Sequence, residues 1–158
     1  MDKVYVEATY KSLNKLNEEL CGDRVEIVKN DDSYFVVLSD GLGSGVKANI
    51  LSTLTSKIIS TMMFQGASIE DTVETIVHTL PVCSVRKVAY STFMILQIDY
   101  DGNAYLVEFD SPGCIFVRDG RLMNIEYNYR SIAGKEIKEA HFKVKPNDFM
   151  MLLSDGVV

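Results

Sequence analysis

The stretch Phe35-Val36-Val37-Leu38-Ser39-Asp40-Gly41 recurs almost unchanged as Met150-Met151-Leu152-Leu153-Ser154-Asp155-Gly156. In each stretch, four apolar residues, long enough for a buried strand, are followed by Ser-Asp-Gly. A strand with so little polar surface is typical of a sheet that is covered on both faces. We therefore expect both strands to lie inside such a sheet, and each to carry one carboxylate, Asp40 or Asp155, to the rim of the core.

Two carboxylates at the rim of an apolar core are costly unless a positive charge lies between them. Hard divalent cations such as Mg²⁺ and Mn²⁺ prefer carboxylate and carbonyl oxygens, so the repeated motif indicates a metal site. The alternative is that Ser-Asp-Gly only makes a turn, in which the Asp side chain bonds its own backbone and Gly supplies a positive φ. The recurrence of the motif favours the metal site.

Composition restricts the class of protein. The 158 residues, 47% hydrophobic and 24% charged, fit one globular domain, which we take to span residues 1–158. The net charge of −6 argues against nucleic acid as a partner. The sequence contains no apolar run of about 18 residues, so no membrane span is predicted. The three cysteines show no metal-ligand spacing, which favours a reduced, cytoplasmic setting.

A hairpin is predicted on both sides of Asn30-Asp31-Asp32-Ser33, a strong turn sequence. Residues 24–29 alternate between apolar and polar types, and residues 34–39 form the first of the two apolar strands. In an antiparallel pair, the start of the first strand lies beside the end of the second. Asp23 and Asp40 should therefore face each other.

The remaining sequence predicts a mixture of helices and antiparallel strands. Helices are expected over residues 46–64 and, after a capping sequence at Ser68, over residues 69–80. Residues 12–20 fit a short helix or a long connection. Strands are expected over residues 3–11, 88–99, 104–109, 115–118, 122–126 and 137–144, and again before Asp155. The lone histidines, His78 and His141, are interpreted as surface or packing residues.

Four motifs occur in order along the chain: Cys21-Gly22-Asp23, Leu38-Ser39-Asp40-Gly41-Leu42-Gly43-Ser44-Gly45, Tyr90-Ser91-Thr92 and Leu152-Leu153-Ser154-Asp155-Gly156. In these motifs the chain resembles the metal-dependent protein phosphatases of the PPM superfamily, in the bacterial branch of the sporulation stage II protein E and stressosome phosphatases. The resemblance runs from about residue 1 to the last residue. It implies an α+β fold, a four-layer α/β/β/α sandwich of two antiparallel sheets flanked by helices.

The resemblance also implies a site with two Mn²⁺ or Mg²⁺ ions. Asp40 would bridge both ions, Asp155 would bind the first, and Asp23 and the Gly41 carbonyl would bind the second. Asp40 and Asp155 would thus be the catalytic residues. Two nearby cations activate water towards phosphorus and neutralise the phosphoryl oxygens. The substrate-binding residues cannot be assigned, and Arg24 stays outside the proposed set.

Two departures from the family pattern matter. Eukaryotic members carry a His where this chain has Leu42, so no equivalent general acid is expected. The family also has a further metal-binding Asp well after the second Ser-Asp-Gly, and these 158 residues do not include it. We therefore expect a domain that is incomplete at its C-terminus, with one weak ion site and an exposed apolar edge that favours self-association.

The sequence is compatible with more than one function. The first is hydrolysis of phosphoserine or phosphothreonine on a bacterial regulatory protein by a water that bridges two metal ions. The alternative is a catalytically impaired relative that serves as a binding or switch module. A nucleotide-binding domain built on Gly41 to Gly45 is disfavoured, because the glycine spacing is not that of a dinucleotide fingerprint.

Overall fold

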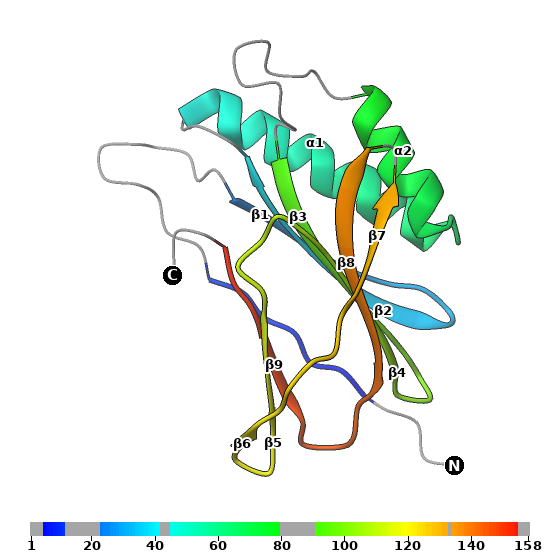
Figure 1. Cartoon of the computed structure of the whole chain (residues 1–158), viewed down its shortest axis with the longest axis vertical. Helices are drawn as coiled ribbons and strands as arrows, with labels where there is room; N and C mark the ends of the chain where they lie inside the picture. Colours follow the sequence, from blue (N-terminus) through cyan, green and yellow to red (C-terminus); the bar gives the residue numbers. More distant parts are fainter. Residues whose placement is uncertain (1–4, 12–22, 42–44, 80–90, 133, 155–158) are drawn as a thin grey trace.

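The computed structural model describes residues 5–11, 23–41, 45–79, 91–132 and 134–154. Nine strands and two helices occur in these ranges (Figure 1). In chain order they are β1 (Asp23–Lys29), β2 (Ser33–Gly41), α1 (Gly45–Phe64), α2 (Ile69–Thr79), β3 (Ser91–Asp99), β4 (Asn103–Phe109), β5 (Cys114–Arg118), β6 (Arg121–Leu122), β7 (Asn128–Ile132), β8 (Lys135–Lys143) and β9 (Phe149–Leu152). No helix in these ranges is long and apolar enough to cross a membrane.

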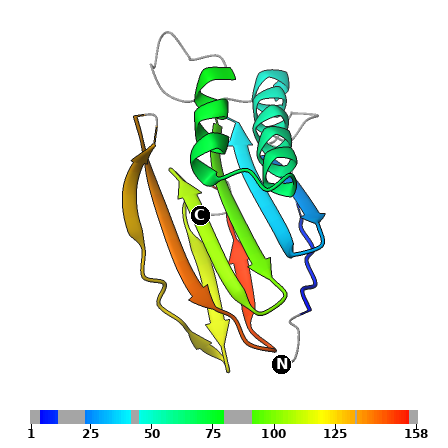
Figure 2. The same cartoon turned by 90° about the vertical axis from the view of Figure 1, so that its right-hand side faces the viewer.

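The strands form two antiparallel sheets. One has six strands in the order β1-β2-β3-β4-β8-β7, and the other has three in the order β6-β5-β9. Helices α1 and α2 stand side by side on one face of the six-stranded sheet, and the three-stranded sheet covers the opposite face (Figures 1 and 2). These layers match the expected α/β/β part of the sandwich. A helical layer on the three-stranded sheet is not found among the described residues.

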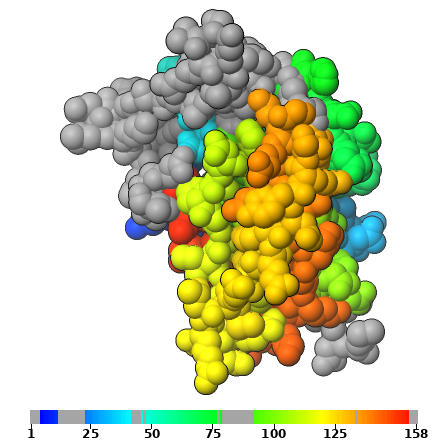
Figure 3. All heavy atoms as spheres, in the orientation of Figure 1, coloured from blue at the N-terminus to red at the C-terminus, as the bar shows by residue number. Residues whose placement is uncertain are grey.

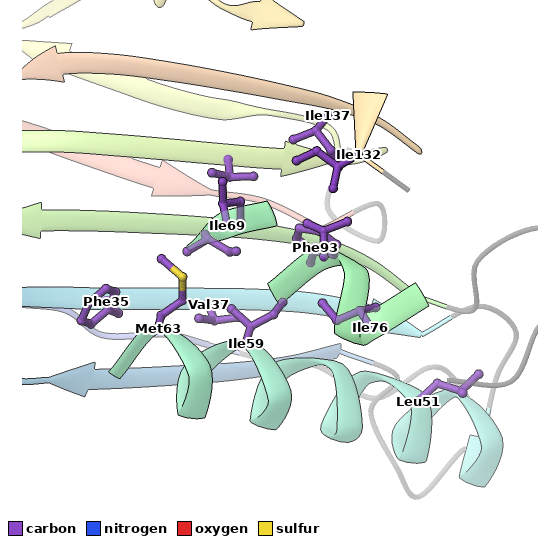
Figure 4. Packing of buried hydrophobic residues seen from close by; sticks show 13 residues of the cluster. Phe35, Val37, Leu51, Ile59, Met63, Ile69, Ile76, Phe93, Ile132 and Ile137 are labelled. Carbon is purple, nitrogen blue, oxygen red and sulfur yellow. The ribbon is translucent and has the colours of Figure 1, made fainter. Parts of the chain in front are cut away.

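Two apolar cores lie on the two faces of the six-stranded sheet. The helix-side core joins Phe35 and Val37 of β2 to Leu51, Ile59 and Met63 of α1 (Figure 4). The core between the sheets includes Met94, Leu96 and Leu106, with Leu38 and Leu152 packed against it. Successive side chains of a strand point to opposite faces, so β2 supplies both cores. This double burial places β2 in the centre of the structure.

The predicted hairpin is confirmed. Its turn is held by the side chain of Asn30, whose Oδ1 accepts hydrogen bonds from the backbone N–H groups of Asp32 and Ser33, each at 2.8 Å. This is the local side-chain bonding that makes Asn a turn residue. The structure extends the first strand by one residue, to Asp23, and the second by one residue at its start and two at its end, to Ser33 and Gly41.

Both predicted helices are also confirmed, as α1 and α2. The Ser68 Oγ accepts a hydrogen bond of 3.1 Å from the N–H of Asp71, so Ser68 caps α2 as expected. The histidines lie on the surface: His78 bonds the carbonyl of Glu74 within α2, and His141 is an exposed side chain of β8.

Two strand predictions were wrong in part, and one strand was missed. Residues 5–11, the described part of the first predicted strand, join no ladder; Val6 packs against the core between the sheets, but Ala8 and Tyr10 are exposed, so the apolar–polar alternation did not record a buried face there. The strand predicted at 122–126 shrinks to β6, and β7 was not predicted, because its sequence Asn128-Tyr129-Arg130-Ser131-Ile132 is mostly polar. Residues 12–20 and 88–90 lie outside the described residues.

The second apolar strand also differs from expectation. β9 was expected to be covered on both faces, yet Phe149 is 54% and Met151 41% exposed. Within the described residues β9 is an edge strand of the three-stranded sheet, and both helices lie on the other sheet. Four apolar residues in a row therefore indicated a strand correctly but did not reveal how many of its faces are buried. The predicted self-association through this region stays a prediction.

A partly buried ion pair lies at the start of β9. Arg118, at the end of β5, donates from Nε and Nη2 to the two carboxylate oxygens of Asp148, at 2.9 and 2.8 Å. Asp148 is only 5% exposed, and the hydrogen bonds from Arg118 lower its pKa below the usual 3.8. Because the folded-state pKa is the lower one, this pair stabilises the fold above about pH 4 and loses its effect as the pH falls.

We expect Asp148→Asn to lower the free energy of unfolding at neutral pH. The free energy of unfolding of the variant should also decrease less than that of the wild type as the pH falls. The measurement is denaturant unfolding of the wild type and the variant between pH 3 and pH 7. Asp101→Asn, a change of the same type at an exposed hairpin tip, is the control and should leave the curve unchanged. An unaltered acid profile in Asp148→Asn would contradict the role of this pair.

Candidate metal centre

Asp23 and Asp40 lie directly opposite each other in the β1–β2 ladder, as the hairpin predicted. Directly paired residues of adjacent strands point to the same face of a sheet. Asp40 shares that face with Leu38, two residues before it, which packs in the core between the sheets. Both carboxylates are partly exposed. The strand register therefore brings two acidic side chains together at the rim of the inter-sheet core.

The second Ser-Asp-Gly sequence reaches the same place. The Ser154 hydroxyl donates a hydrogen bond of 2.7 Å to Oδ2 of Asp23, across a separation of 131 residues. Ser154 is 8% exposed, so this bond is shielded from water. Asp155, the next residue, lies outside the described residues. The two recurring motifs are thus adjacent in space, as far as Ser154.

Gly41 ends β2 where α1 approaches the sheet. A Cβ atom placed on Gly41 would lie 2.0 Å from the backbone oxygen of Ala48 in α1, a distance at which two atoms overlap. Ala48 is fully buried and cannot move aside without the helix. A second contact holds the same helix, because the Ser39 hydroxyl donates to the carbonyl of Ser52 at 2.6 Å. Only glycine fits at position 41.

Asp40 lines a small pocket between the sheets. The other described residues around it come from β3, from the loop after β4 and from the end of β9, and include Thr92, Ser111, Pro112 and Ser154. The sequence identified the Ser111-Pro112-Gly113 stretch only as a turn. The loop lines this pocket because Thr92 pairs with Asp40 in the ladder and β4 follows as the next strand.

Arg24 does not point to the two carboxylates. Its Nε lies 3.4 Å from Oε1 of Glu26, the same oxygen that lies 3.2 Å from Nζ of Lys57 in α1. Arg24 and Lys57 therefore share the carboxylate of Glu26 in β1. This arrangement agrees with leaving Arg24 out of the candidate site.

The donor chemistry fits a hard divalent cation. Asp23 and Asp40 provide carboxylate oxygens on neighbouring strands, and the backbone of Gly41 provides a carbonyl next to Asp40. Oxygen ligands of this kind suit Mg²⁺ and Mn²⁺. The residues that the structure describes contain no group of three or more acidic, His or Cys side chains that could hold a metal. The described part thus supplies two of the three predicted carboxylates.

Sequence comparison decides the family. The sequence model of the family described as Stage II sporulation protein E (SpoIIE) matches residues 30–158. This chain belongs to the SpoIIE family. The match covers the second strand of the hairpin, both helices and both Ser-Asp-Gly motifs, and so confirms the resemblance found in the sequence. No curated protein matches the sequence at a significant level.

Solved structures resemble this SpoIIE-family chain in fold. The PP2C phosphatase domain with a fragment of the regulatory domain of SpoIIE from Bacillus subtilis is 22% identical, with a TM-score of 0.72 over 86% of this chain and 42% of that chain. The structure of RsbX in complex with magnesium is 20% identical, with a TM-score of 0.69 over 92% of this chain and 72% of that one. The RsbU and RsbW domains of a Mycobacterium tuberculosis protein give a TM-score of 0.74 at 15% identity, over 90% of this chain and 42% of that chain.

We expect Gly41→Ala to destabilise this SpoIIE-family chain by roughly 3 kcal/mol or more, because the added methyl group overlaps helix backbone. Gly120→Ala is the matched control: it has a positive φ of 75° but open space around it, so only the backbone strain of about 1 kcal/mol applies. Urea unfolding measures both. Equal losses in the two variants would show that α1 does not restrict position 41.

Proposed function

We propose that this chain is the greater part of a metal-dependent protein phosphatase domain that hydrolyses phosphoserine or phosphothreonine on a regulatory protein. The observation that carries the proposal is the direct pairing of Asp23 with Asp40, with Ser154 bonded to Asp23. Membership of the SpoIIE family supports it. So does the fold shared with a PP2C phosphatase domain and with the magnesium complex of RsbX.

The proposed ligands are Asp23, Asp40, the Gly41 carbonyl and Asp155. Two bound Mg²⁺ or Mn²⁺ ions would neutralise the phosphoryl oxygens and make water a nucleophile near neutral pH. Asp40 is the residue assigned to both ions. Ser154 would orient Asp23 by donating to Oδ2 of its carboxylate. Residues that support a ligand in this way affect metal affinity almost as strongly as the ligands do.

The leaving group has no evident proton donor among the motif residues. The position after Gly41, where a His occurs in eukaryotic relatives, is Leu42 and cannot transfer a proton. We infer that water protonates the departing serine or threonine oxygen. A phosphate ester of low leaving-group pKa, such as an aryl phosphate, needs less of this help and is therefore a suitable first substrate.

We expect Asp40→Asn to lower the turnover of an aryl phosphate with Mn²⁺ at least about 100-fold, roughly 2.7 kcal/mol in the activation barrier. Calorimetric titration with Mn²⁺ should show weakened binding in the same variant. Asp31→Asn, at the turn end of the same hairpin, is the control and should retain both properties. Circular dichroism should show a retained fold, because removing one of two adjacent carboxylates relieves repulsion.

The outcomes separate the candidate functions. Turnover of Asp40→Asn within about tenfold of wild type, about 1.4 kcal/mol, would refute the role of Asp40. Wild-type protein that binds Mn²⁺ but does not turn over any phosphate ester would instead favour the binding or switch module. These measurements are made on the full-length protein, because this chain covers 42% of the solved B. subtilis chain, which holds the phosphatase domain and a fragment of the regulatory domain.

The Ser154–Asp23 hydrogen bond provides a second test. Loss of an outer hydrogen-bond partner of a metal ligand commonly weakens metal affinity by about 10–100-fold. We expect Ser154→Ala to weaken Mn²⁺ binding in that range, and Ser154→Thr to retain most of the affinity because it keeps the hydroxyl group. Ser131→Ala, on an exposed position of β7, is the control. Unchanged affinity in Ser154→Ala would show that Asp23 is oriented without this bond.

A further inference from the structure

A groove of about 240 Å³ runs beside the candidate metal centre. Its lining consists of residues 112–115 with Tyr127, Lys138 and Leu153. Pro112 and Leu153 also line the small pocket that contains Asp40, so the groove and the pocket share a wall. Figure 3 shows the surfaces of β5 and of the β7–β8 pair side by side on this face of the molecule. A chain segment that reaches Asp40 can therefore continue along this groove.

Lys138 provides the one charged side chain among the described lining residues. It projects from β8 and is half-buried. Its Nζ lies 4.9 Å from the centre of the Tyr127 ring, a cation–π contact that holds the ammonium group within the groove. The ion pairs found in the described part of the chain do not include Lys138. Its charge is therefore available to a ligand.

An acidic residue of the neighbouring strand lies opposite Lys138 in the sheet. Glu108 faces Lys138 across the β4–β8 ladder, but its side chain is fully enclosed beneath the groove. Its Oε1 accepts from the Ser111 hydroxyl at 3.4 Å. Burial, together with the nearby carboxylate of Glu108, raises the pKa of Tyr127, so the phenol stays protonated. Glu108 is thus buried beneath the groove and bonded by Ser111, while the half-buried Lys138 lines the groove itself.

We propose that this groove binds the segment of the phosphoprotein that flanks the phosphorylated residue, and that Lys138 selects an acidic side chain in that segment. The inference rests on the proposed phosphatase function and adds a substrate preference to it. The ring of Tyr127 and the apolar side chains of Pro112, Ile115 and Leu153 contact the body of the segment. The ammonium group of Lys138 pairs with its carboxylate.

The test uses synthetic phosphoserine peptides of one composition in which a single Asp, Lys or Ala occupies each position around the phosphoserine in turn. At the position that reaches the groove, we expect the Asp peptide to exceed the Lys peptide in kcat/KM by about fivefold, the size of an exposed ion pair. Lys138→Glu should reverse this order, and Lys138→Met should abolish it. Lys143→Glu, the same charge change on the opposite face of β8, should leave the order unchanged.

Aryl phosphate turnover separates this inference from the proposed function. An aryl phosphate is too small to reach Lys138, so all Lys138 variants should retain wild-type turnover of it. If wild-type protein hydrolyses the aryl phosphate but shows no charge preference, or prefers the Lys peptide, the inference is wrong and the phosphatase function stands. If no ester is hydrolysed, the function is wrong. In that case, fluorescence anisotropy measures whether the groove prefers acidic peptides. Equal affinity for the Asp and Lys peptides would refute the proposed role of Lys138.

Discussion

The register of the β1–β2 hairpin is the constraint on which the candidate centre depends. Seven residue pairs align the two strands, and the pair at one end is Asp23 with Asp40. A shift of the register by one residue would turn every side chain of a strand to the opposite face. Asp40 would then enter the core under α1 instead of the rim between the sheets. The Asn30 turn prevents this shift, because its side chain bonds the backbone of Asp32 and Ser33.

The central position of β2 connects this register to the rest of the fold. One face of the strand packs against α1 and the other against the three-stranded sheet, so its apolar residues are needed in both cores. The close approach of Ala48 to Gly41 and the Ser39–Ser52 hydrogen bond fasten α1 at the same end as Asp40. Any displacement of α1 along the sheet would therefore also displace the backbone of Gly41, which follows Asp40 in the chain. The helix is thus part of the support of the site.

The charges of the chain are distributed unevenly around the candidate metal centre. The net charge is −6, and the candidate centre concentrates carboxylates where the phosphate of the proposed substrate would bind. A phosphate group would be repelled there unless cations are bound, which explains why the proposed reaction depends on metal. Lys138 lines the neighbouring groove, which shares Pro112 and Leu153 with the pocket of Asp40, and this arrangement supports its proposed role with residues that flank the phosphate.

The sequence by itself determined the local features of this protein. The Asn30 turn, the pairing of Asp23 with Asp40, the Ser68 cap and both helices follow from contacts between residues close in the chain, and such contacts leave a pattern in a short window. The family was also readable, because four short motifs occur in order. The metal roles of Asp23, Asp40, Gly41 and Asp155 remain predictions.

Only the tertiary structure decided the features that join distant segments. The Ser154–Asp23 hydrogen bond links residues 131 positions apart, and no window of sequence contains both. The groove of Lys138 and Tyr127 likewise needs β5, β8 and the segment before β7 to meet. β9 was recognised as a strand, but its exposure was misjudged, because a run of apolar residues records hydrophobicity and not the number of layers that cover it. Pairing and burial in a sheet are set by neighbours in space, and those neighbours come from the whole chain.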